Sequence, residues 1–399
     1  MSNKFSFKWC RTIDDISPDD WVKIYGSDII KGRGFMKANE EAEFEDVEFH
    51  YLQVFKGNRI IAIVPCFAYG MDLLNIASSG EAKTRIAWVR KLFPKFLKLR
   101  AFVTGSYAAT CEHFIEYTSD LSEEEKKEVA EIIGGEIKKK SREVKASFVF
   151  VKDVRERSIN QVKDILTSDY KFFISFPTTA IPIISEVKYP ASLRKKNRKR
   201  FRNFRERFEK EFYWETITDF GGETVRDFTH LYKAVLDKAK NKFEFLNEKF
   251  FDSVNKLLGD GAFLLVGKNK ETDEIRVMVL ILENEANLIP LYMGFKYKDD
   301  DSKVLYLNTI FNTVKEAEKR GKSYVDFGQM SYYPKTMSGA LVENIYYGFW
   351  SSKPIVRWLI NHGLDKIFTP PAVPEHVYLE PYADEAHRIL TEKGFVLLN

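Results

Sequence analysis

The amino-acid sequence predicts an α/β (α+β) protein with two domains, each a mixed but mostly antiparallel sheet flanked by helices. Residues 261–335 show three short strands, one amphipathic helix and a further strand. A strand, a hairpin, another strand, a helix and a final strand precede residue 152, and the same order of elements returns between residues 211 and 329. The length of 399 residues fits two domains of the usual ~150–200 residues.

The stretch from Gly261 to Lys335 has the clearest pattern. Its three apolar runs are rich in branched and aromatic residues and are bounded by polar turns, which predicts antiparallel strands at 262–267, 276–282 and 287–295. Apolar residues then recur at spacings of three and four, which predicts a helix over 303–320. Residues 323–329 predict one more strand, and a polar, aromatic loop follows at 330–335.

The first half of the chain contains the other copy of this order. Ser17 and Pro18 form a good helix start, and Ser122 before three glutamates forms another. The remaining predictions here are strands at 49–54 and 59–67 around a Lys56-Gly57-Asn58 turn, strands at 102–107 and 147–151, and a basic amphipathic helix at 85–99 broken at Pro94. That basic helix fits either a surface helix on the core or a lid that touches an anionic partner.

The second half begins after a crossover near residue 185, so the expected domains are 1–185 and 186–399. The elements predicted here are a basic helix at 192–211, a strand at 212–217, a helix at 224–239, a last strand at 345–351, a helix at 353–361 and an apolar tail at 383–398.

Composition narrows the classes of protein. A net charge of +4 is too small to indicate a nucleic-acid protein by itself. The three cysteines and six histidines are scattered, so neither a disulfide framework nor a metal site is expected. The first residues lack the apolar core of a signal peptide, and no apolar run approaches the ~20 residues that span a bilayer. We therefore expect a cytoplasmic protein without a transmembrane segment.

The helix over 192–211 has the most distinctive composition. Phe201, Phe204 and Phe208 share one side, and arginines and lysines cover the rest. Three interpretations stay open: a solvated basic face, a site for the phosphates of a donor such as coenzyme A, or contact with tRNA or an anionic membrane surface. The candidate phosphate-binding residues are Arg198, Arg202 and Arg205.

The sequences "YMGF" before the helix and "VDFGQ...YYPK" after it resemble the core of the GNAT acyltransferase superfamily, and more closely its Fem-like branch, which includes the peptidoglycan aminoacyltransferases. The resemblance implies two GNAT-like domains, a tail that packs back on the first domain, and an N-acyltransferase that uses acyl-CoA, with aminoacyl-tRNA as the other carrier. Residues 296–303 depart from the GNAT phosphate loop, and Asp299 to Asp301 would repel a pyrophosphate. A different donor or binding mode is therefore open.

Candidate site residues lie where the last strand of the motif ends. Asp326 is a candidate base, Tyr333 a general acid, and Lys335 a cation for an anionic group. Gln329 and Tyr292 are candidate substrate contacts, and the resemblance of "LYKAVLDKAKNKFEFLNEKFF" to the helices beside the acceptor pocket of Fem-like proteins adds Tyr232 and Phe243. Structural alternatives exist, since Asp326 also fits a turn cap and Tyr333 a packing residue.

The resemblance thus implies direct transfer of an acyl or aminoacyl group from a thioester or ester to the amine of a small molecule or peptide, without a covalent enzyme intermediate. The alternative function is a non-catalytic protein that binds phosphate-rich partners, tRNA or an anionic membrane, through the basic helix at 194–210.

Overall fold

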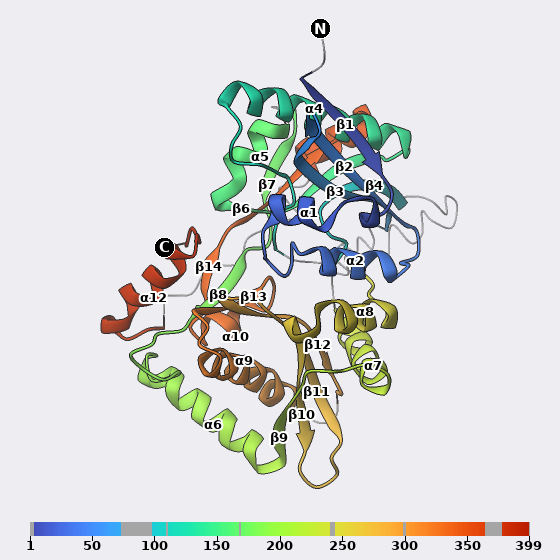
Figure 1. Ribbon diagram of the computed structural model, residues 1–399. Helices are drawn as coiled ribbons and strands as arrows, with labels where there is room; N and C mark the ends of the chain where they lie inside the picture. Colours follow the sequence, from blue (N-terminus) through green and yellow to red (C-terminus); the bar gives the residue numbers. More distant parts are fainter. Residues whose placement is uncertain are drawn as a thin grey trace. The chain divides into compact units, whose positions relative to one another are not determined.

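Figure 1 shows the computed structural model, which describes residues 4–72, 98–108, 111–166, 169–239, 244–297, 301–363 and 377–398. The chain divides into two compact units. Unit 1 comprises Met1–Ser175, Ala239–Phe250 and Tyr346–Thr369, and unit 2 comprises Phe176–Lys238, Phe251–Ile345 and Pro370–Asn399. Each unit contains one mixed sheet flanked by helices, so the predicted fold class is confirmed.

The sheet of unit 1 has the order β1-β2-β3-β4-β6-β15-β7, with β5 paired to β3. Neighbours are antiparallel from β1 to β4, and β4 and β6 are parallel. Its strands are β1 Phe5–Cys10, β2 Val47–Lys56, β3 Arg59–Asp72, β4 Lys98–Thr104, β5 Glu116–Tyr117, β6 Phe148–Arg155, β7 Lys171–Ile174 and β15 Ile345–Trp350. Its helices are α1 Pro18–Tyr25, α2 Arg33–Glu41, α4 Glu123–Glu143, α5 Ile159–Leu166 and α11 Pro354–Gly363.

Both predicted helix starts in unit 1 are confirmed. The Ser17 side chain accepts from the Asp20 amide at the start of α1. Ser122 and Glu125 form a reciprocal capping box at the start of α4, which satisfies two amides that the helix cannot pair internally. One face of α4 then packs on the sheet through Val129, Ile133 and Ile137.

The sheet of unit 2 has the order β14-β8-β13-β12-β11-β10-β9. Its strands are β8 Thr178–Pro182, β9 Phe212–Ile217, β10 Ala262–Asn269, β11 Ile275–Glu283, β12 Asn287–Phe295, β13 Tyr324–Gly328 and β14 Leu341–Glu343. Its helices are α6 Lys195–Glu211, α7 Glu223–Lys238, α8 Glu248–Leu258 (which begins in unit 1), α9 Ser302–Lys319, α10 Tyr332–Thr336 and α12 Glu380–Glu392. Helices α6 and α9 lie together on one face of this sheet, and α7 packs against β12 on the other (Figure 1).

The strand predicted at 345–351 exists, but it does not belong to the second sheet. As β15 it pairs antiparallel with β7 and lies next to β6, in the sheet of unit 1. Aromatic packing explains this placement, because the Phe349 ring stacks on Phe150 at 4.8 Å between centroids and Trp350 joins the core of unit 1.

The units also differ from the contiguous division at residue 185 that the sequence suggested. The first boundary falls between Ser175 and Phe176, and unit 1 takes in Ala239–Phe250 from the middle of the chain. That segment is held by the Phe250 ring, which lies 5.9 Å from the rings of both Phe35 and Phe44. The C-terminal tail packs within unit 2, where Leu390 and Phe395 contact the residues around Ala180, which the sequence had placed in the first domain.

The loop predicted at 330–335 contains the short helix α10. The basic helix predicted at 85–99 falls largely outside the described residues. Within the described part of the chain, no helix is both long and apolar enough to cross a membrane.

Candidate functional site

The candidate site is the gap between β12 and β13, the parallel pair of unit 2. In the described chain their pairing is limited to Asn287 with Tyr324 and Leu288 with Val325, although β12 continues to Phe295. The other edge of β12 stays paired with β11 up to Phe295, and β13 pairs with β8. Beyond Leu288 the two parallel strands therefore diverge, and β12 presents a backbone edge that a ligand can pair with.

The side chains that flank this gap can be assigned to a face of the sheet. Val325 and Phe327 of β13 join the core under α9, so Asp326 between them points to the opposite face. Tyr292 of β12 also points to that face, because its ring lies 5.7 Å from Tyr232 of α7 and 6.2 Å from Phe251 of α8. The structure thus places Asp326 and the pair Tyr292–Tyr232 on one face of the sheet.

Asp326 is buried and hydrogen-bonded. Its Oδ1 accepts from the Thr178 hydroxyl at 3.2 Å and from the Gly328 amide at 2.9 Å. The bond to Gly328 is the turn cap that the sequence allowed as an alternative, and the bond to Thr178 ties β13 to β8. These contacts fix the carboxylate at the end of β13 in one orientation.

Lys335 is buried, and its ammonium donates to backbone carbonyls. The acceptors are the carbonyl oxygens of Phe327, Gly328 and Gln329, at 2.7, 3.2 and 2.8 Å from Nζ. These bonds fix the backbone where β13 ends, just before Met330 and Ser331 adopt positive φ values of 68° and 51°. The role of Lys335 in holding an anionic group stays a prediction.

The rest of this turn is also held by hydrogen bonds. The Gln329 side chain donates to the Phe176 carbonyl at 2.6 Å, and the Tyr332 hydroxyl donates to the Pro177 carbonyl at 3.0 Å. The Gln329 amide thereby anchors the turn to the segment before β8, and its contact with substrate stays a prediction. Tyr333 is 63% exposed, and the guanidinium of Arg200 lies 5.5 Å from its ring centroid.

Close packing keeps α7 against β12. A Cβ on Gly294 would lie 2.5 Å from the Leu231 Cβ and 2.7 Å from the Tyr232 amide nitrogen. Only glycine allows this approach, which brings Tyr232 to Tyr292. Phe243, the other predicted acceptor contact, lies outside the described residues.

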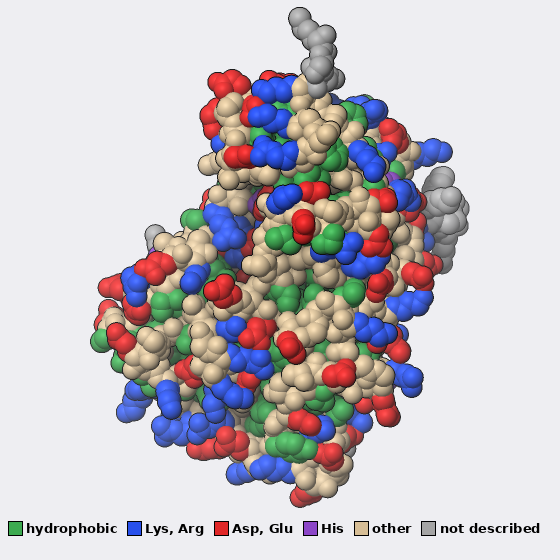
Figure 2. Space-filling view, viewed as in Figure 1, with side chains coloured by type: hydrophobic (Ala, Val, Ile, Leu, Met, Phe, Trp, Pro, Cys, Tyr) green, Lys and Arg blue, Asp and Glu red, His purple; other side chains and the backbone are tan. Residues whose placement is uncertain are grey.

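The basic helix α6 has the predicted buried side. Phe201 and Phe208 are buried and Phe204 is partly buried. Among the candidate arginines, Arg202 is exposed, whereas Arg198 is half-buried and donates to the Ala191 carbonyl. Arg205 is also half-buried, with Nε 3.5 Å from Glu209. Lys and Arg side chains gather over this part of unit 2 in Figure 2.

Two further residues belong to the surroundings of the gap and were missed from sequence. Thr178 binds Asp326, and the β-branched residues Thr178, Thr179 and Ile181 were the available signal for the strand that carries it. Tyr306 of α9 is the second: burial raises the pKa of its phenol to about 12, while a hydrogen bond with the Ser331 side chain lowers it in part. That bond links α9 to the strained turn.

The acidic stretch after β12 is described only from Asp301 onward. Asp301, one of the three aspartates expected to repel a pyrophosphate, accepts from Arg276 at 2.7 Å, so its charge is compensated. Within the described residues, no group of three or more His, Cys, Asp or Glu could hold a metal ion.

Comparison with known proteins finds similarity in structure only. No family model matches the sequence, and no curated protein sequence matches it. The solved structure of L-PGS from Bacillus licheniformis aligns with a TM-score of 0.51 at 12% identity, over 88% of this chain and 96% of that one. FemX aligns with a TM-score of 0.54 at 11% identity, over 88% of this chain and 100% of that one. The chain therefore has the fold of FemX and L-PGS, and the Fem-like fold that its motifs resemble is confirmed.

Proposed function

We propose that unit 2 catalyses N-acyl transfer from a thioester or ester donor to an amine, with the reaction at the gap between β12 and β13. The observation that carries this proposal is the restriction of their pairing to Asn287–Tyr324 and Leu288–Val325. A sheet that opens between two parallel strands offers backbone N–H and C=O groups on one side and a carboxylate, Asp326, on the other. The fold shared with FemX and L-PGS supports the same assignment.

The donor lies along the open edge of β12. An extended acyl-bearing arm pairs with that edge as an added strand would, so most of its contacts are to backbone. A backbone N–H of β12 then lies near the carbonyl oxygen of the acyl group. Such a donor stabilises the negative charge that this oxygen gains when the amine attacks.

The acceptor lies on the face of Tyr292 and Tyr232. Its amine attacks the acyl carbon, the C–N bond forms, and the bond to the carrier sulfur or oxygen breaks. The amine proton passes to the Asp326 carboxylate, directly or through one water, and the carrier leaves with a proton from a phenol or from solvent. Tyr333 remains the proposed proton donor, and Lys335 becomes a positioning residue that fixes the backbone after Asp326.

A turnover assay tests the role of Asp326. The purified protein is incubated with acyl-CoAs or aminoacyl-tRNAs and a panel of amines, and amide products are detected by mass spectrometry. Asp326→Asn should lower kcat by at least about a hundredfold, the usual range for a lost general base. Asp260→Asn, at an exposed aspartate of the same unit, is the matched control and should keep full activity. Equal activity of the two variants would reject Asp326 as the base.

The carrier is proposed to be coenzyme A or tRNA, and thermal unfolding separates them. A ligand that binds only the native protein raises the melting temperature. A shift with one acyl-CoA that persists in moderate salt supports coenzyme A. A shift with aminoacyl-tRNA alone that salt removes supports tRNA bound through α6. No shift with any donor would count against the gap as a donor site.

The alternative function is phosphate binding through α6 without catalysis. The exposed cations Lys195, Lys196, Lys199 and Arg202 favour it, since they share one solvent-facing side of the helix. Reversing the charge of Lys199 and Arg202 should abolish tRNA or vesicle binding in a pure binding protein. Asp326→Asn should leave that binding unchanged. If only the second variant loses function, the catalytic assignment is the better one.

A further inference from the structure

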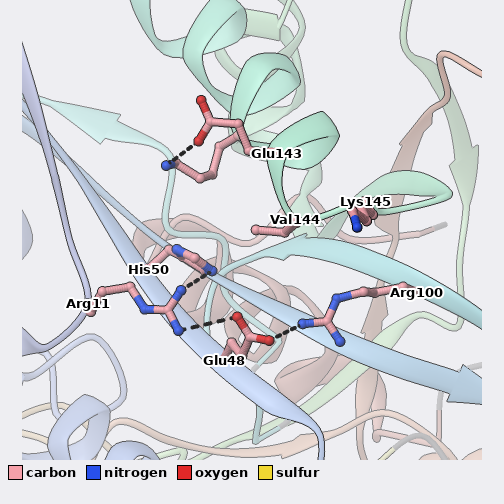
Figure 3. A pocket seen from close by; sticks show the side chains of 8 residues that line it. Arg11, Glu48, His50, Arg100, Glu143, Val144 and Lys145 are labelled. Carbon is pink, nitrogen blue, oxygen red and sulfur yellow. Dashed lines mark hydrogen bonds and ion pairs between the residues drawn. The ribbon is translucent and has the colours of Figure 1, made fainter.

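A charged pocket of about 550 Å³ lies in unit 1, and neither the motifs nor the proposed acyl transfer uses it. It is lined by Arg11, Glu48, His50, Arg100, Lys140, Glu143, Val144 and Lys145, and we call it the Arg11–Arg100 pocket. Figure 3 shows Arg11 and Arg100 on opposite sides of Glu48, with His50 beside Arg11 and the end of α4 over them. All of these residues belong to unit 1.

The topology of the sheet creates the pocket. Glu48 and His50 are two residues apart on β2, so their side chains point to the same face of the sheet. Arg11 directly follows β1, the neighbour of β2, and Arg100 lies on β4. Helix α4 packs on this face with its middle turns and ends at Glu143. The sheet continues beyond the end of the helix, and the pocket is the uncovered part.

Hydrogen bonds hold the two arginines in place but use only some of their N–H donors. Glu48 accepts from Arg11 at 3.2 Å and also from Arg100, which donates to Asp46 at 3.0 Å as well. Arg11 also contacts Nε2 of His50 at 3.3 Å. Each guanidinium has more N–H groups than these bonds use. The shared carboxylate therefore pre-orients two cations and leaves some of their N–H groups available to a ligand.

His50 contributes a neutral donor. Burial, followed by the charges of Arg11 and Lys140, lowers its pKa to about 4, so the ring is neutral at physiological pH. Because Arg11 can only donate, Nε2 is the acceptor and Nδ1 carries the hydrogen. Nδ1 of this buried side chain has no hydrogen-bond partner among the described residues.

The charge of the lining is positive. Arg11, Arg100, Lys140 and Lys145 oppose Glu48 and Glu143, and even with Asp46 at the rim the cations outnumber the anions by one. Lys140 pairs with Glu143, whereas no ion pair of Lys145 is recorded in the described chain. Carbonyls at the C-terminal end of α4 add some negative potential, but Lys138, Lys139 and Arg142 stand on the same turns and oppose it.

We propose that the Arg11–Arg100 pocket binds a small phosphate-bearing ligand. Guanidinium forks match phosphate oxygens in pairs, an ammonium such as Lys145 adds charge, and a neutral imidazole N–H adds a further donor. This site is independent of the proposed acyl transfer in unit 2.

The test uses His50 as a reporter inside the pocket. The full-length protein is prepared with isotopically labelled histidine, and the His50 resonance is assigned with His50→Gln. Inorganic phosphate and pyrophosphate are titrated into the protein at constant ionic strength. Malonate, a dicarboxylate, is titrated in the same way as the control anion without phosphate. Saturable movement of the His50 resonance with the phosphates, and a weaker response to malonate, is the expected result.

Two variants show whether binding occurs at this pocket. Lys145→Glu and Arg11→Gln should each weaken phosphate binding by about tenfold, because each removes one charge-assisted contact. Lys127→Glu, an exposed lysine near the other end of α4, makes the same change of net charge as Lys145→Glu and should leave binding unchanged. The circular dichroism and melting temperature of each variant verify its fold.

Three results would overturn the proposal. The first is no saturable response of His50 to either phosphate. The second is equal binding of malonate, which would mean that the pocket does not select phosphate chemistry. The third is equal weakening by Lys145→Glu and Lys127→Glu, which would reduce the effect to the overall charge of the protein.

Discussion

At the scale of single residues, Lys335 shows how a buried charged side chain can hold a turn of backbone in place. Its ammonium is buried on the carbonyl oxygens of Phe327, Gly328 and Gln329. A buried cation with several acceptors is stable only while each partner is present. The residue therefore fixes the backbone that carries Asp326 and the strained pair Met330–Ser331.

Replacement of Lys335 by methionine is a direct test of this role. Lys335→Met keeps the length of the side chain but leaves buried carbonyls without their donor, which should cost about 1–3 kcal/mol of unfolding free energy. Lys319→Met is the matched control, because the Lys319 side chain is 76% exposed and its loss should be almost neutral. Urea unfolding of both variants gives the comparison. Equal stability of the two would contradict the assignment.

His50 gives a second prediction, for pH. Its pKa in the folded protein is lowered to about 4, by burial first and then by Arg11 and Lys140, whereas an unfolded histidine titrates near ~6.5. The unfolded chain thus binds more protons between these values, so unfolding free energy rises with pH there. The contribution of His50 to the unfolding free energy is fully present above about pH 6.5 and is lost as the pH decreases toward 4. Buried His113, with a pKa lowered to about 3 by burial and by Lys31, acts in the same direction.

Urea unfolding between pH 4 and pH 7 in a buffer without phosphate measures this dependence. His50→Gln should flatten the rise of stability with pH, because glutamine does not titrate. His387→Gln, at an exposed histidine of α12, should leave the slope unchanged. A slope that survives His50→Gln in full would assign the dependence to other groups.

At the scale of elements, the contact between α7 and β12 depends on one position. Gly294→Ala would bring a Cβ within 2.5 Å of Leu231 and 2.7 Å of the Tyr232 amide, so the helix must move away from the strand. We expect a loss of stability of about 1–3 kcal/mol and weaker binding of the acceptor amine, because Tyr232 moves with α7.

Gly135→Ala is the control for this prediction. Gly135 lies in α4, and an added Cβ there meets nothing within 4 Å. The same change should raise stability by up to about 1 kcal/mol, since alanine favours helix. Thermal unfolding and the KM for the amine are measured for both variants. If Gly294→Ala raised stability as Gly135→Ala does, the close approach of α7 would be wrong.

The elements that sequence predicted well are those with a long local pattern. The strand over 287–295 was expected at the bounds of β12, and the helix over 303–320 differs from α9 by one residue at each end. β8 was missed because its run from Thr178 to Pro182 is short and lies between prolines. The position of Asp326 at a strand end was predictable, but the partners of Lys335 were not, because backbone carbonyls leave no trace in a sequence.

At the scale of the whole molecule, the chain passes between its two sheets twice. It leaves the sheet of unit 1 after β7 and enters that of unit 2 at β8, and it returns between β14 and β15. Local periodicity cannot reveal this exchange, because an apolar strand such as β15 fits the pattern of either sheet. The choice is made by contacts far apart in sequence, such as the Trp350 indole donating to Asp169 at 2.8 Å.

This exchange predicts the behaviour of a fragment containing residues 1–185, the contiguous first domain suggested by sequence. The fragment lacks β15, and with it the Phe349 ring that stacks on Phe150 and the Trp350 side chain in the core. It also lacks Phe250, which packs between Phe35 and Phe44. Truncating one large buried aromatic side chain lowers the unfolding free energy by about 3–5 kcal/mol. The loss of three such side chains is therefore comparable to the whole unfolding free energy of a typical domain.

We therefore expect the 1–185 fragment to show no cooperative unfolding transition by circular dichroism and to be degraded rapidly by protease. The full-length chain, under the same conditions, should unfold cooperatively.

The triple substitution Phe250→Ala, Phe349→Ala and Trp350→Ala in the full chain is the internal comparison, because it removes the same rings without cutting the backbone. It should destabilise unit 1 strongly while the basic helix of unit 2 keeps its protection from hydrogen exchange. Cooperative unfolding of the fragment on its own would mean that the segments returning to unit 1 are dispensable, and that the sheet from β1 to β6 is a complete folding unit.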